Sequence, residues 1–202
     1  MDLFTGSRSV PQQYGKTPRN YLLHNDGSGH FEDVTDKQAP AMKNTGMITG
    51  AAAADINNDG IDDVFLGGAR NTKPALFISR GDGKFTKTKQ PALESDSSYE
   101  DTDAAWADVN GDHSIDLVVA SGGNEYYGPD THNSPRVYLN DGKGNFIKKE
   151  DAFHDLFLTA SCIETYDFNN DGHTDLFIGG RAVPWEYGKL PQSYLLMNDG
   201  TG

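Results

Sequence analysis

The sequence predicts an all-β protein built from repeated four-stranded antiparallel sheets. Three observations carry this prediction: the chain repeats itself, its apolar runs are short and bounded by glycine, and an acidic loop recurs in each repeat. Segments 2–27 and 175–200 match closely at a constant separation of 173 positions, as between Asp2 and Asp175. Two weaker copies lie between them, so each repeat spans about 58 residues.

Each repeat is expected to contain four strands. The first is a run of small residues, such as 50–54 and 104–107, and it leads into the acidic loop. A short apolar run follows, and then an aromatic strand that enters a glycine-rich hairpin turn before the last strand. Small side chains suit a first strand crowded near a central axis. A proline three residues before an aromatic residue marks the third strand in every copy: Pro18 and Tyr21, Pro74 and Phe77, Pro135 and Tyr138, Pro191 and Tyr194.

Four-stranded units at this spacing predict the blades of a β-propeller. The expected boundaries are a partial blade at 1–45, full blades at 46–99 and 100–158, and a partial blade at 159–202. Propellers close with about 4–8 blades. We therefore expect one propeller domain that is a fragment of a longer chain, its ring completed by further blades or by an oligomer.

Composition limits the possible partners. The chain has 17 Lys and Arg against 30 Asp and Glu, a net charge of −13, which argues against nucleic acid as a partner. The single cysteine, Cys162, excludes an intrachain disulfide and a cysteine-based zinc site. No apolar run approaches the about 18 residues of a membrane span. The acidic residues 94–103 between two repeats are expected to form a solvated face.

The acidic loops carry the predicted chemistry. All three read Asp-x-Asn-x-Asp-x-x-x-Asp, and side-chain oxygens at positions 1, 3, 5 and 9 would converge with the carbonyl of position 7 where the backbone wraps tightly. An all-oxygen set of high coordination suits Ca²⁺ better than Mg²⁺ or Zn²⁺. Up to three structural calcium ions are therefore expected, with these ligands: Asp55, Asn57, Asp59, Ile61 and Asp63; Asp108, Asn110, Asp112, Ser114 and Asp116; Asp167, Asn169, Asp171, His173 and Asp175.

Two other interpretations of these loops were considered. An EF-hand needs Glu at position 12 and flanking helices, but position 12 is Leu66, Val119 or Ile178 and both flanks have strand character. Asp, Asn and Gly could instead form simple polar turns. Three loops in register, each followed by an apolar strand, favour calcium. The second loop is expected to bind most weakly, because His113 replaces the glycine at position 6.

These residues also carry a family resemblance. The acidic loop followed by an apolar strand and Gly-Gly resembles the FG-GAP/VCBS repeat, as in integrin α-subunit propellers. The segments Tyr-Leu-Leu-x-Asn-Asp-Gly-x-Gly-x-Phe and Gly-Gly-Arg-x-Val-Pro resemble the bacterial branch allied to cartilage acidic protein. The resemblance covers essentially all of 1–202. It implies an extracellular or cell-surface propeller, here bacterial, with structural calcium and a role in binding or adhesion rather than catalysis. Calcium affinities of extracellular modules, typically about 10⁻⁴–10⁻³ M, fit that location.

Strand direction separates a scaffold face from a candidate binding face. Acidic loops and glycine turns should share one face, and the long loops 5–20, 121–137 and 178–193 should share the other. Arginine and aromatic side chains there suit recognition of a protein or glycan. The candidate ligand-binding residues are Arg8, Tyr14, Tyr126, Tyr127, Arg181, Trp185 and Tyr187.

Three alternatives stay open for this face and for the protein. The repeated Val-Pro-x-x-Tyr-Gly loop could serve only to pack one blade against the next. The propeller face could be the cleft of a polysaccharide lyase or hydrolase, since a fold does not fix a function. The chain could also be a purely structural module of a larger secreted protein. No catalytic constellation is recognisable in the sequence, and we expect a protein that is not an enzyme.

Overall fold

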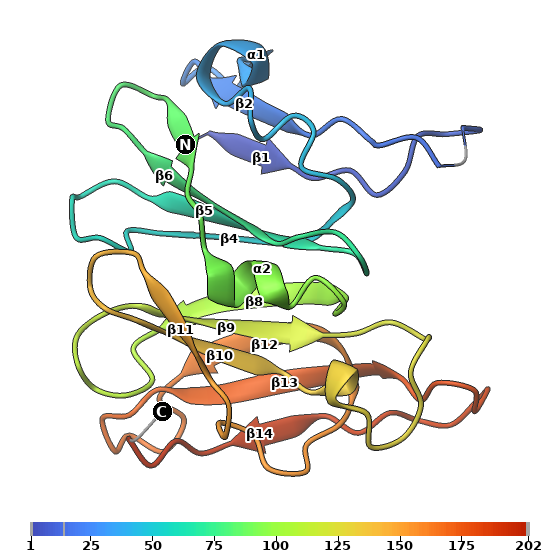
Figure 1. Ribbon diagram of the computed structural model, residues 1–202. Coiled ribbons are helices and arrows are strands. Elements are labelled where there is room, and N and C mark those ends of the chain that lie inside the picture. The colour runs from blue at the N-terminus through green and yellow to red at the C-terminus, as the bar shows by residue number, and fades with distance from the viewer. Residues whose placement is uncertain (1, 14, 201–202) are drawn as a thin grey trace.

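The computed structural model describes residues 2–13 and 15–200 and contains four antiparallel sheets (Figure 1). Strand order follows chain order in every sheet. The first sheet contains β1 (Leu3–Thr5), β2 (Tyr21–Asn25) and β3 (Phe31–Asp33). The second contains β4 (Ile48–Ala54), β5 (Asp63–Gly68), β6 (Ala75–Ser79) and β7 (Phe85–Lys87). The all-β prediction is confirmed.

The other two sheets repeat this plan. The third contains β8 (Asp101–Ala107), β9 (Asp116–Ser121), β10 (Arg136–Asn140) and β11 (Phe146–Lys149). The fourth contains β12 (Thr159–Tyr166), β13 (Asp175–Ala182) and β14 (Tyr194–Leu196). Figure 1 shows the sheets stacked in chain order, with the first and the fourth at opposite ends. Four antiparallel sheets are compatible with propeller blades.

The first strands of neighbouring sheets lie against one another, β4 on β8 and β8 on β12. Their backbones approach closely: a Cβ built on Gly50 of β4 would lie 3.1 Å from the Cα of Asp103 in β8. Such a distance is shorter than an ordinary Cβ contact, so glycine fits this position best, in keeping with the run of small residues. The prediction that these strands are crowded is confirmed.

Apolar side chains fill the space between successive sheets in three clusters. Alternate residues of one strand point to opposite faces, so each sheet has a backward face toward the preceding sheet and a forward face toward the following one. In β5, Val64 and Leu66 belong to the cluster with the first sheet, whereas Phe65 belongs to the cluster with the third. In the same way Leu117 of β9 points backward and Val118 forward.

Short helices lie in the connections, where the sequence analysis predicted none. They are α1 (Thr35–Gln38), α2 (Pro91–Ser95) and the 3₁₀ turn η1 (Thr131–Asn133). Pro91 opens α2, a position that proline favours because its fixed φ suits the first turn. Leu93 is buried in the cluster between the second and third sheets, so α2 covers the outer part of that interface.

The proline–aromatic landmark does not mark equivalent positions in the four sheets. Phe77 pairs with Val64 and Tyr138 pairs with Leu117, which each follow the ninth residue of an acidic loop. Tyr194 pairs instead with Ile178, two residues further along. A shift of two residues leaves a side chain on the same face of the sheet. The aromatic side chain therefore still faces the preceding sheet.

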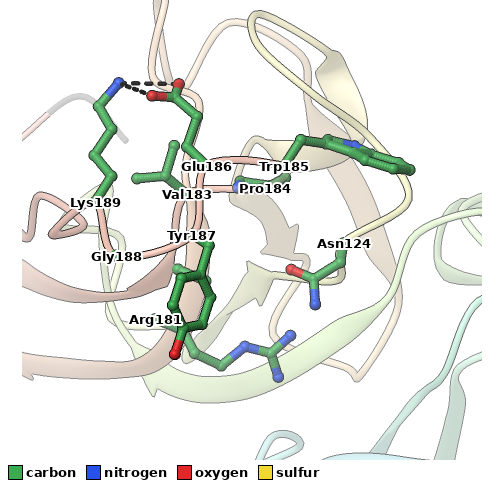
Figure 2. A pocket seen from close by; sticks show the side chains of 10 residues that line it. Asn124, Arg181, Val183, Pro184, Trp185, Glu186, Tyr187, Gly188 and Lys189 are labelled. Carbon is green, nitrogen blue, oxygen red and sulfur yellow. Dashed lines mark hydrogen bonds and ion pairs between the residues drawn. The ribbon is translucent and has the colours of Figure 1, made fainter.

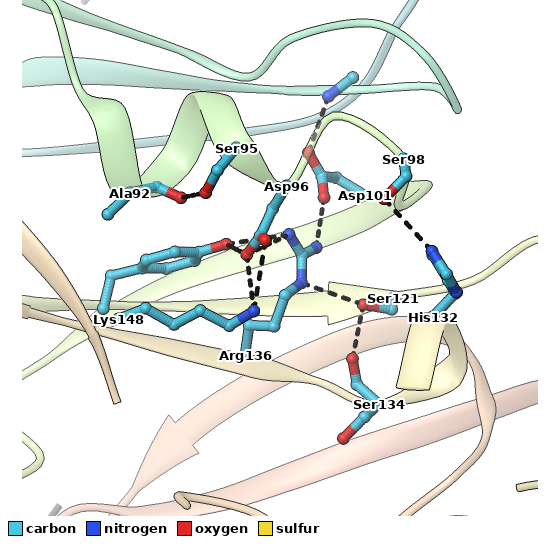
Figure 3. A network of polar contacts seen from close by, with 12 residues as sticks. Ala92, Ser95, Asp96, Ser98, Asp101, Ser121, His132, Ser134, Arg136 and Lys148 are labelled. Carbon is cyan, nitrogen blue, oxygen red and sulfur yellow. Dashed lines mark hydrogen bonds and ion pairs between the residues drawn. The ribbon is translucent and has the colours of Figure 1, made fainter. Parts of the chain in front are cut away.

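The acidic segment 94–103 is partly buried, which corrects the prediction of a solvated face (Figure 3). Asp96 and Asp101 are both buried. The guanidinium of Arg136 donates to Asp101 and to the hydroxyl of Tyr138 (3.0 Å), and that hydroxyl donates to Asp96 (2.6 Å). Asp101 also accepts a hydrogen bond from the backbone N–H of Gly68 (2.9 Å). The network therefore ties the third sheet to β5 of the second.

The buried network holds Arg136 and Tyr138 in their usual protonation states. Burial raises the pKa of the Tyr138 hydroxyl far above its ordinary value. Burial alone would lower the pKa of Arg136, but Asp101, Tyr138 and Asp96 together outweigh it and the pKa lies above its ordinary value. The guanidinium also lies over the ring of Tyr99, 4.2 Å from its centroid. Arg136 is thus a charged residue whose hydrogen-bond partners are buried.

Candidate functional site

The three acidic loops share four internal hydrogen bonds, although the side-chain amide of position 3 donates to position 9 in the first loop and to position 5 in the other two. In the first, the N–H of Asp59 donates to Asp55 Oδ1 and to Asn57 Oδ1, both at 3.0 Å, and the N–H of Gly60 donates to Asp55 Oδ2 at 2.8 Å. The N–H of Ile61 donates to Asp59 Oδ1 at 3.0 Å. The second and third loops repeat these four bonds at 2.7 to 3.2 Å. Oxygens of positions 1 and 3 thus meet at one backbone nitrogen in every loop.

Two left-handed residues make this wrapping possible. Position 6 has a positive φ in all three loops: 86° at Gly60, 69° at His113 and 90° at Gly172. The requirement predicted from the glycine is confirmed, and His113 adopts this conformation without being glycine. Position 4 is also left-handed, with Gly111 (74°) in the second loop and asparagine in the others. The sequence analysis missed this second position, although asparagine and glycine are the residues that tolerate it best.

The ninth residue of each loop is an aspartate with no exposed surface. In the second, third and fourth sheets its Oδ1 accepts a hydrogen bond at 2.8 Å from a backbone N–H at or just after the end of the third strand; the pairs are Asp63 with Ser79, Asp116 with Asn140, and Asp175 with Asn198. In the second and third loops Oδ2 accepts from the N–H of Val109 (3.1 Å) and Phe168 (2.9 Å). These aspartates therefore join the acidic loop to the glycine turn at one end of the sheet.

The carboxylates of one loop have contrasting electrostatics. Burial raises the pKa of Asp63 and raises that of Asp116 to about 6, and the neighbouring acidic residues of each loop add to the shift. Hydrogen bonds from backbone N–H groups lower the pKa of Asp112 and of Asp171. Ionised, exposed carboxylates thus lie near a buried one that they repel. A bound cation would relieve this repulsion.

The donor chemistry of the loops fits a hard cation. Within residues 2–13 and 15–200, no three Asp, Glu, His or Cys side chains approach closely enough to hold a metal ion by themselves. The structure brings the oxygens of positions 1 and 3 to one backbone nitrogen, bonds the position-5 carboxylate to the N–H of position 7, and gives position 9 backbone partners. A carboxylate has about four lone-pair sites, so a backbone-bonded aspartate keeps acceptor capacity. The oxygen atoms of the loops are chemically suitable for Ca²⁺. The assignment of the calcium ligands stays a prediction.

The predicted ligand-binding residues of the fourth sheet lie together. Arg181, Trp185 and Tyr187 line a cavity of about 570 Å³, with Asn124 of the third sheet at its edge (Figure 2). Trp185 is 80% exposed and Tyr187 is completely exposed, whereas Pro184, which directly precedes Trp185, is buried. The two aromatic side chains are therefore accessible in the described part of the chain.

The remaining predicted residues are distributed over the same long loops. Arg8 lines a separate hollow of about 850 Å³ and forms an ion pair with Glu100 (3.4 Å). The ring of Tyr126 stacks on His132, with centroids 4.1 Å apart, and is used in packing. The hydroxyl of Tyr127 donates to Glu186 (3.1 Å), which links the loops of the third and fourth sheets. Tyr14 lies outside the described residues.

The loops that follow β1 and β13 share one backbone conformation. The N–H of Gln13 bonds to the carbonyl of Val10 (3.1 Å), as that of Glu186 bonds to Val183 (3.2 Å). Gln12 and Trp185 occupy the same position and are both left-handed, with φ of 59° and 65°. The loop scaffold is thus duplicated, while its tip carries glutamine in one copy and tryptophan in the other.

Comparison with known families agrees with this repeat structure. The sequence matches the FG-GAP-like repeat over residues 1–66, 55–119 and 108–178, so that successive matches overlap at an acidic loop and the strand after it. Comparison with curated proteins gave no match. No helix in the described part of the chain is long and apolar enough to span a membrane. Because the three matches together cover residues 1–178, the chain belongs to the FG-GAP-like repeat family.

Proposed function

We propose that this chain is a calcium-stabilised β-propeller module that binds a protein or glycan ligand outside the cell or at its surface. The observation that carries the proposal is the set of hydrogen bonds that the three acidic loops share. In each loop the same backbone N–H groups bond to the side-chain oxygens of positions 1, 3 and 5. Repetition of four backbone bonds in all three loops is more than isolated polar turns require.

Calcium would act structurally in this proposal. The aspartates and asparagine at positions 1, 3 and 5, with the carbonyl of position 7, would hold the ion, and the buried aspartate at position 9 would connect it to the third strand. An ion bound there neutralises charge in a chain of net charge −13. It also stabilises the folded state by mass action, by about 2.7 kcal/mol at a concentration 100 times Kd.

Calcium binding is tested by titration calorimetry and by thermal melting with and without a chelator. We expect the melting temperature to fall on chelation, and Asp55→Asn and Asp167→Asn each to remove one site. Asp141→Asn is the matched control, because Asp141 makes similar backbone bonds in an exposed turn outside the acidic loops. A melting temperature that does not respond to calcium in the unsubstituted chain would contradict the proposal.

Ligand recognition would use the exposed tip of the fourth-sheet loop. Trp185 and Tyr187 present apolar rings beside the charged groups of Arg181 and Lys189 around one cavity (Figure 2). An aromatic surface with a few polar groups is typical of sites that bind a sugar ring or a peptide side chain. Because the backbone of the loop is already held by turns, little ordering would accompany binding.

A glycan array and pull-downs with immobilised protein ligands test recognition. Trp185→Ala and Tyr187→Ala should each reduce binding about tenfold or more. Tyr166→Ala is the control, since Tyr166 is also exposed but ends β12 beside an acidic loop. We propose binding without catalysis, and turnover of a polysaccharide that is lost on mutating Glu186 would overturn that part.

A further inference from the structure

A cavity of about 520 Å³ lies between loops of the third and fourth sheets, and its lining residues fall within 127–133, 157–159 and 182–194. We call it the inter-loop cavity. The loop after β13 borders both this cavity and the one beside Trp185, but Trp185 and Tyr187 line only the latter. Figure 2 shows that Glu186 and Lys189 extend from the loop in the direction opposite to Tyr187. The loop therefore presents two different surfaces to a ligand.

The walls of the inter-loop cavity are mainly apolar. Its apolar lining includes three prolines, whose fixed φ limits movement of the backbone: Pro129, Leu158, Val183, Pro184 and Pro191. Tyr127 and Leu190 also line it and are 58% and 89% exposed, so the cavity is open to solvent. A preformed apolar hollow of this size is typical of a site for a small ligand or for one side chain of a larger ligand.

Several polar groups around the inter-loop cavity already have partners within the protein. The hydroxyl of Tyr127 donates to Oε1 of Glu186 (3.1 Å), and Nζ of Lys189 donates to the same oxygen (3.0 Å). Oγ1 of Thr159 donates to the carbonyl of Gly123 (3.2 Å). These contacts fix the border of the cavity and do not depend on a ligand.

Asn133 differs from these groups. It lines the cavity and is 3% exposed, and within the described part of the chain its Oδ1 has no donor. Its Nδ2 donates to the carbonyl of Gly128 (3.5 Å). Its backbone N–H donates to the carbonyl of Asp130 and its own carbonyl accepts from the N–H of Leu158, both at 2.9 Å. The residue is therefore held in place with a buried acceptor that lacks a donor, which costs free energy.

The balance of apolar walls and one unpaired acceptor selects the kind of ligand. A sugar ring would bring several hydroxyls against apolar walls, and most of them would lose their hydrogen bonds to water. A purely apolar side chain would leave Oδ1 of Asn133 unpaired. The side chain of tyrosine combines an apolar ring with a single hydroxyl donor at its end, so it suits both features.

We propose that the inter-loop cavity binds a tyrosine side chain of a protein ligand, with the phenol hydroxyl donating to Oδ1 of Asn133 and the ring against the proline-containing walls. The inference rests on the proposed function, in which this loop recognises a ligand, and it selects a protein over a glycan. Tyrosine is a common anchor of protein interfaces, because its ring contributes a large contact area and loses little conformational entropy. Trp185 and Tyr187 would then contact other residues of the same ligand.

Two small probes that differ only in the phenol hydroxyl test the site: N-acetyl-tyrosinamide and N-acetyl-phenylalaninamide. Titration of the unsubstituted chain, followed by NMR at the backbone amides of 127–133 and 182–194, measures both affinities. The tyrosine probe should bind about tenfold more tightly, because the phenylalanine probe leaves the buried acceptor unpaired. Equal affinities, or a tyrosine probe that shifts none of these amides, would overturn the proposal.

Asn133→Leu replaces the acceptor with an apolar group of similar size. It should remove the preference for the tyrosine probe, so that the two probes bind about equally. The unfolding free energy of this variant should stay unchanged or rise, since Oδ1 has no hydrogen bond to lose. Asn124→Leu is the matched control, because Asn124 precedes η1 in the same connection but lines only the cavity beside Trp185. A tenfold preference that survives in Asn133→Leu would contradict the role of this asparagine.

The same measurements separate this inference from the proposed function. Tyr187 does not line the inter-loop cavity, so Tyr187→Ala should leave the affinity for the tyrosine probe unchanged. A glycan ligand that is lost in Tyr187→Ala, together with a tyrosine probe that does not bind, would support the proposed function and overturn the inference. A tyrosine probe that binds with the expected preference supports the inference even where Tyr187→Ala retains every ligand.

Discussion

The backbone N–H of Asn140 donates to Oδ1 of Asp116 at 2.8 Å and joins the acidic loop of the third sheet to its glycine turn. Oδ2 of the same aspartate accepts from the N–H of Val109 at 3.1 Å. Asp116 is completely buried. The carboxylate therefore works as a connector between two backbone segments, independently of any ion that the loop holds.

This double role predicts that Asp116 and Asp112 respond differently to substitution. Asp116→Asn replaces one acceptor with an amide group facing an N–H, and it should lower the free energy of unfolding by about 1–3 kcal/mol even in a chelator. Asp112→Asn changes an exposed position and should cost less than about 1 kcal/mol in the chelator. Urea unfolding with and without calcium measures both. Equal losses in the chelator would show that position 9 acts only through the ion.

The second loop contains a backbone conformation that a glycine would adopt at lower cost. His113 has a φ of 69°, and a left-handed residue with a Cβ costs about 1–2 kcal/mol. His113→Gly should therefore stabilise the chain or tighten calcium binding by the second loop, by about 1 kcal/mol at most after the entropy of glycine is included.

Gly172→Ala is the reverse change at the same position of the third loop. A Cβ there would meet no atom within 4 Å, so its cost is purely conformational. It should destabilise the chain by about 1 kcal/mol. Thermal melting with and without calcium checks both variants, and a destabilising His113→Gly would mean that the imidazole has a favourable role of its own.

Removing one partner of the buried pair Arg136–Asp101 should lower the free energy of unfolding strongly, whereas replacing both partners should lower it much less. Asp101→Ala leaves the guanidinium buried with one partner fewer and should lower the free energy of unfolding by about 3–5 kcal/mol. The double variant Asp101→Ala with Arg136→Met removes both charges and should recover part of that loss. Chemical denaturation measures both.

The exposed pair of Arg19 and Asp33 provides the comparison. Its two side chains are separated by 2.7 Å, as in a good ion pair, but each is about one-third exposed. Arg19→Ala should cost only about 0–1 kcal/mol, since water screens the pair and solvates the remaining carboxylate. A similar loss for Arg19→Ala and Asp101→Ala would contradict the importance given to burial.

Local patterns in the sequence predicted the strands and the acidic loops because both depend on nearby residues. Alternation, glycine turns and the spacing of Asp55, Asn57 and Asp59 are visible within ten positions. The burial of Asp101 was not predictable in this way, because its partner Arg136 is 35 residues distant. In a strongly acidic chain, an acidic segment has the composition of a solvated surface. Only the structure shows that the guanidinium of Arg136 lies beside it.

The backbone role of the ninth aspartate escaped prediction for a related reason. Asp116 was predicted only as an oxygen ligand for calcium, whereas its hydrogen-bond partner Asn140 is set by the pairing of β9 with β10. Sequence spacing fixes which oxygens a loop contains, and only the strand register fixes which backbone groups reach them. The same register revealed that the proline–aromatic landmark is displaced by two residues in the fourth sheet.

Asn140 should be among the most sensitive polar residues of the chain. Its Nδ2 donates to the carbonyls of Ile56 (2.8 Å) and Ile115 (2.9 Å), and its Oδ1 accepts from two N–H groups of the glycine turn. Asn140→Ala removes the bond between two sheets and leaves buried carbonyls without donors, so we expect a loss of about 2–3 kcal/mol in unfolding free energy.

Asn145 supplies the matched control for this prediction. It lies in the same turn and donates to Asp141 (2.8 Å), but it is exposed, and water can replace its lost hydrogen bond. Asn145→Ala should therefore change the unfolding free energy by less than about 0.5 kcal/mol. Hydrogen exchange at the amides of 56–58 adds a local reading: faster exchange in Asn140→Ala alone would locate the damage at the contact between the second and third sheets. Equal stability of the two variants would show that the turn, and not the contact between sheets, determines the role of Asn140.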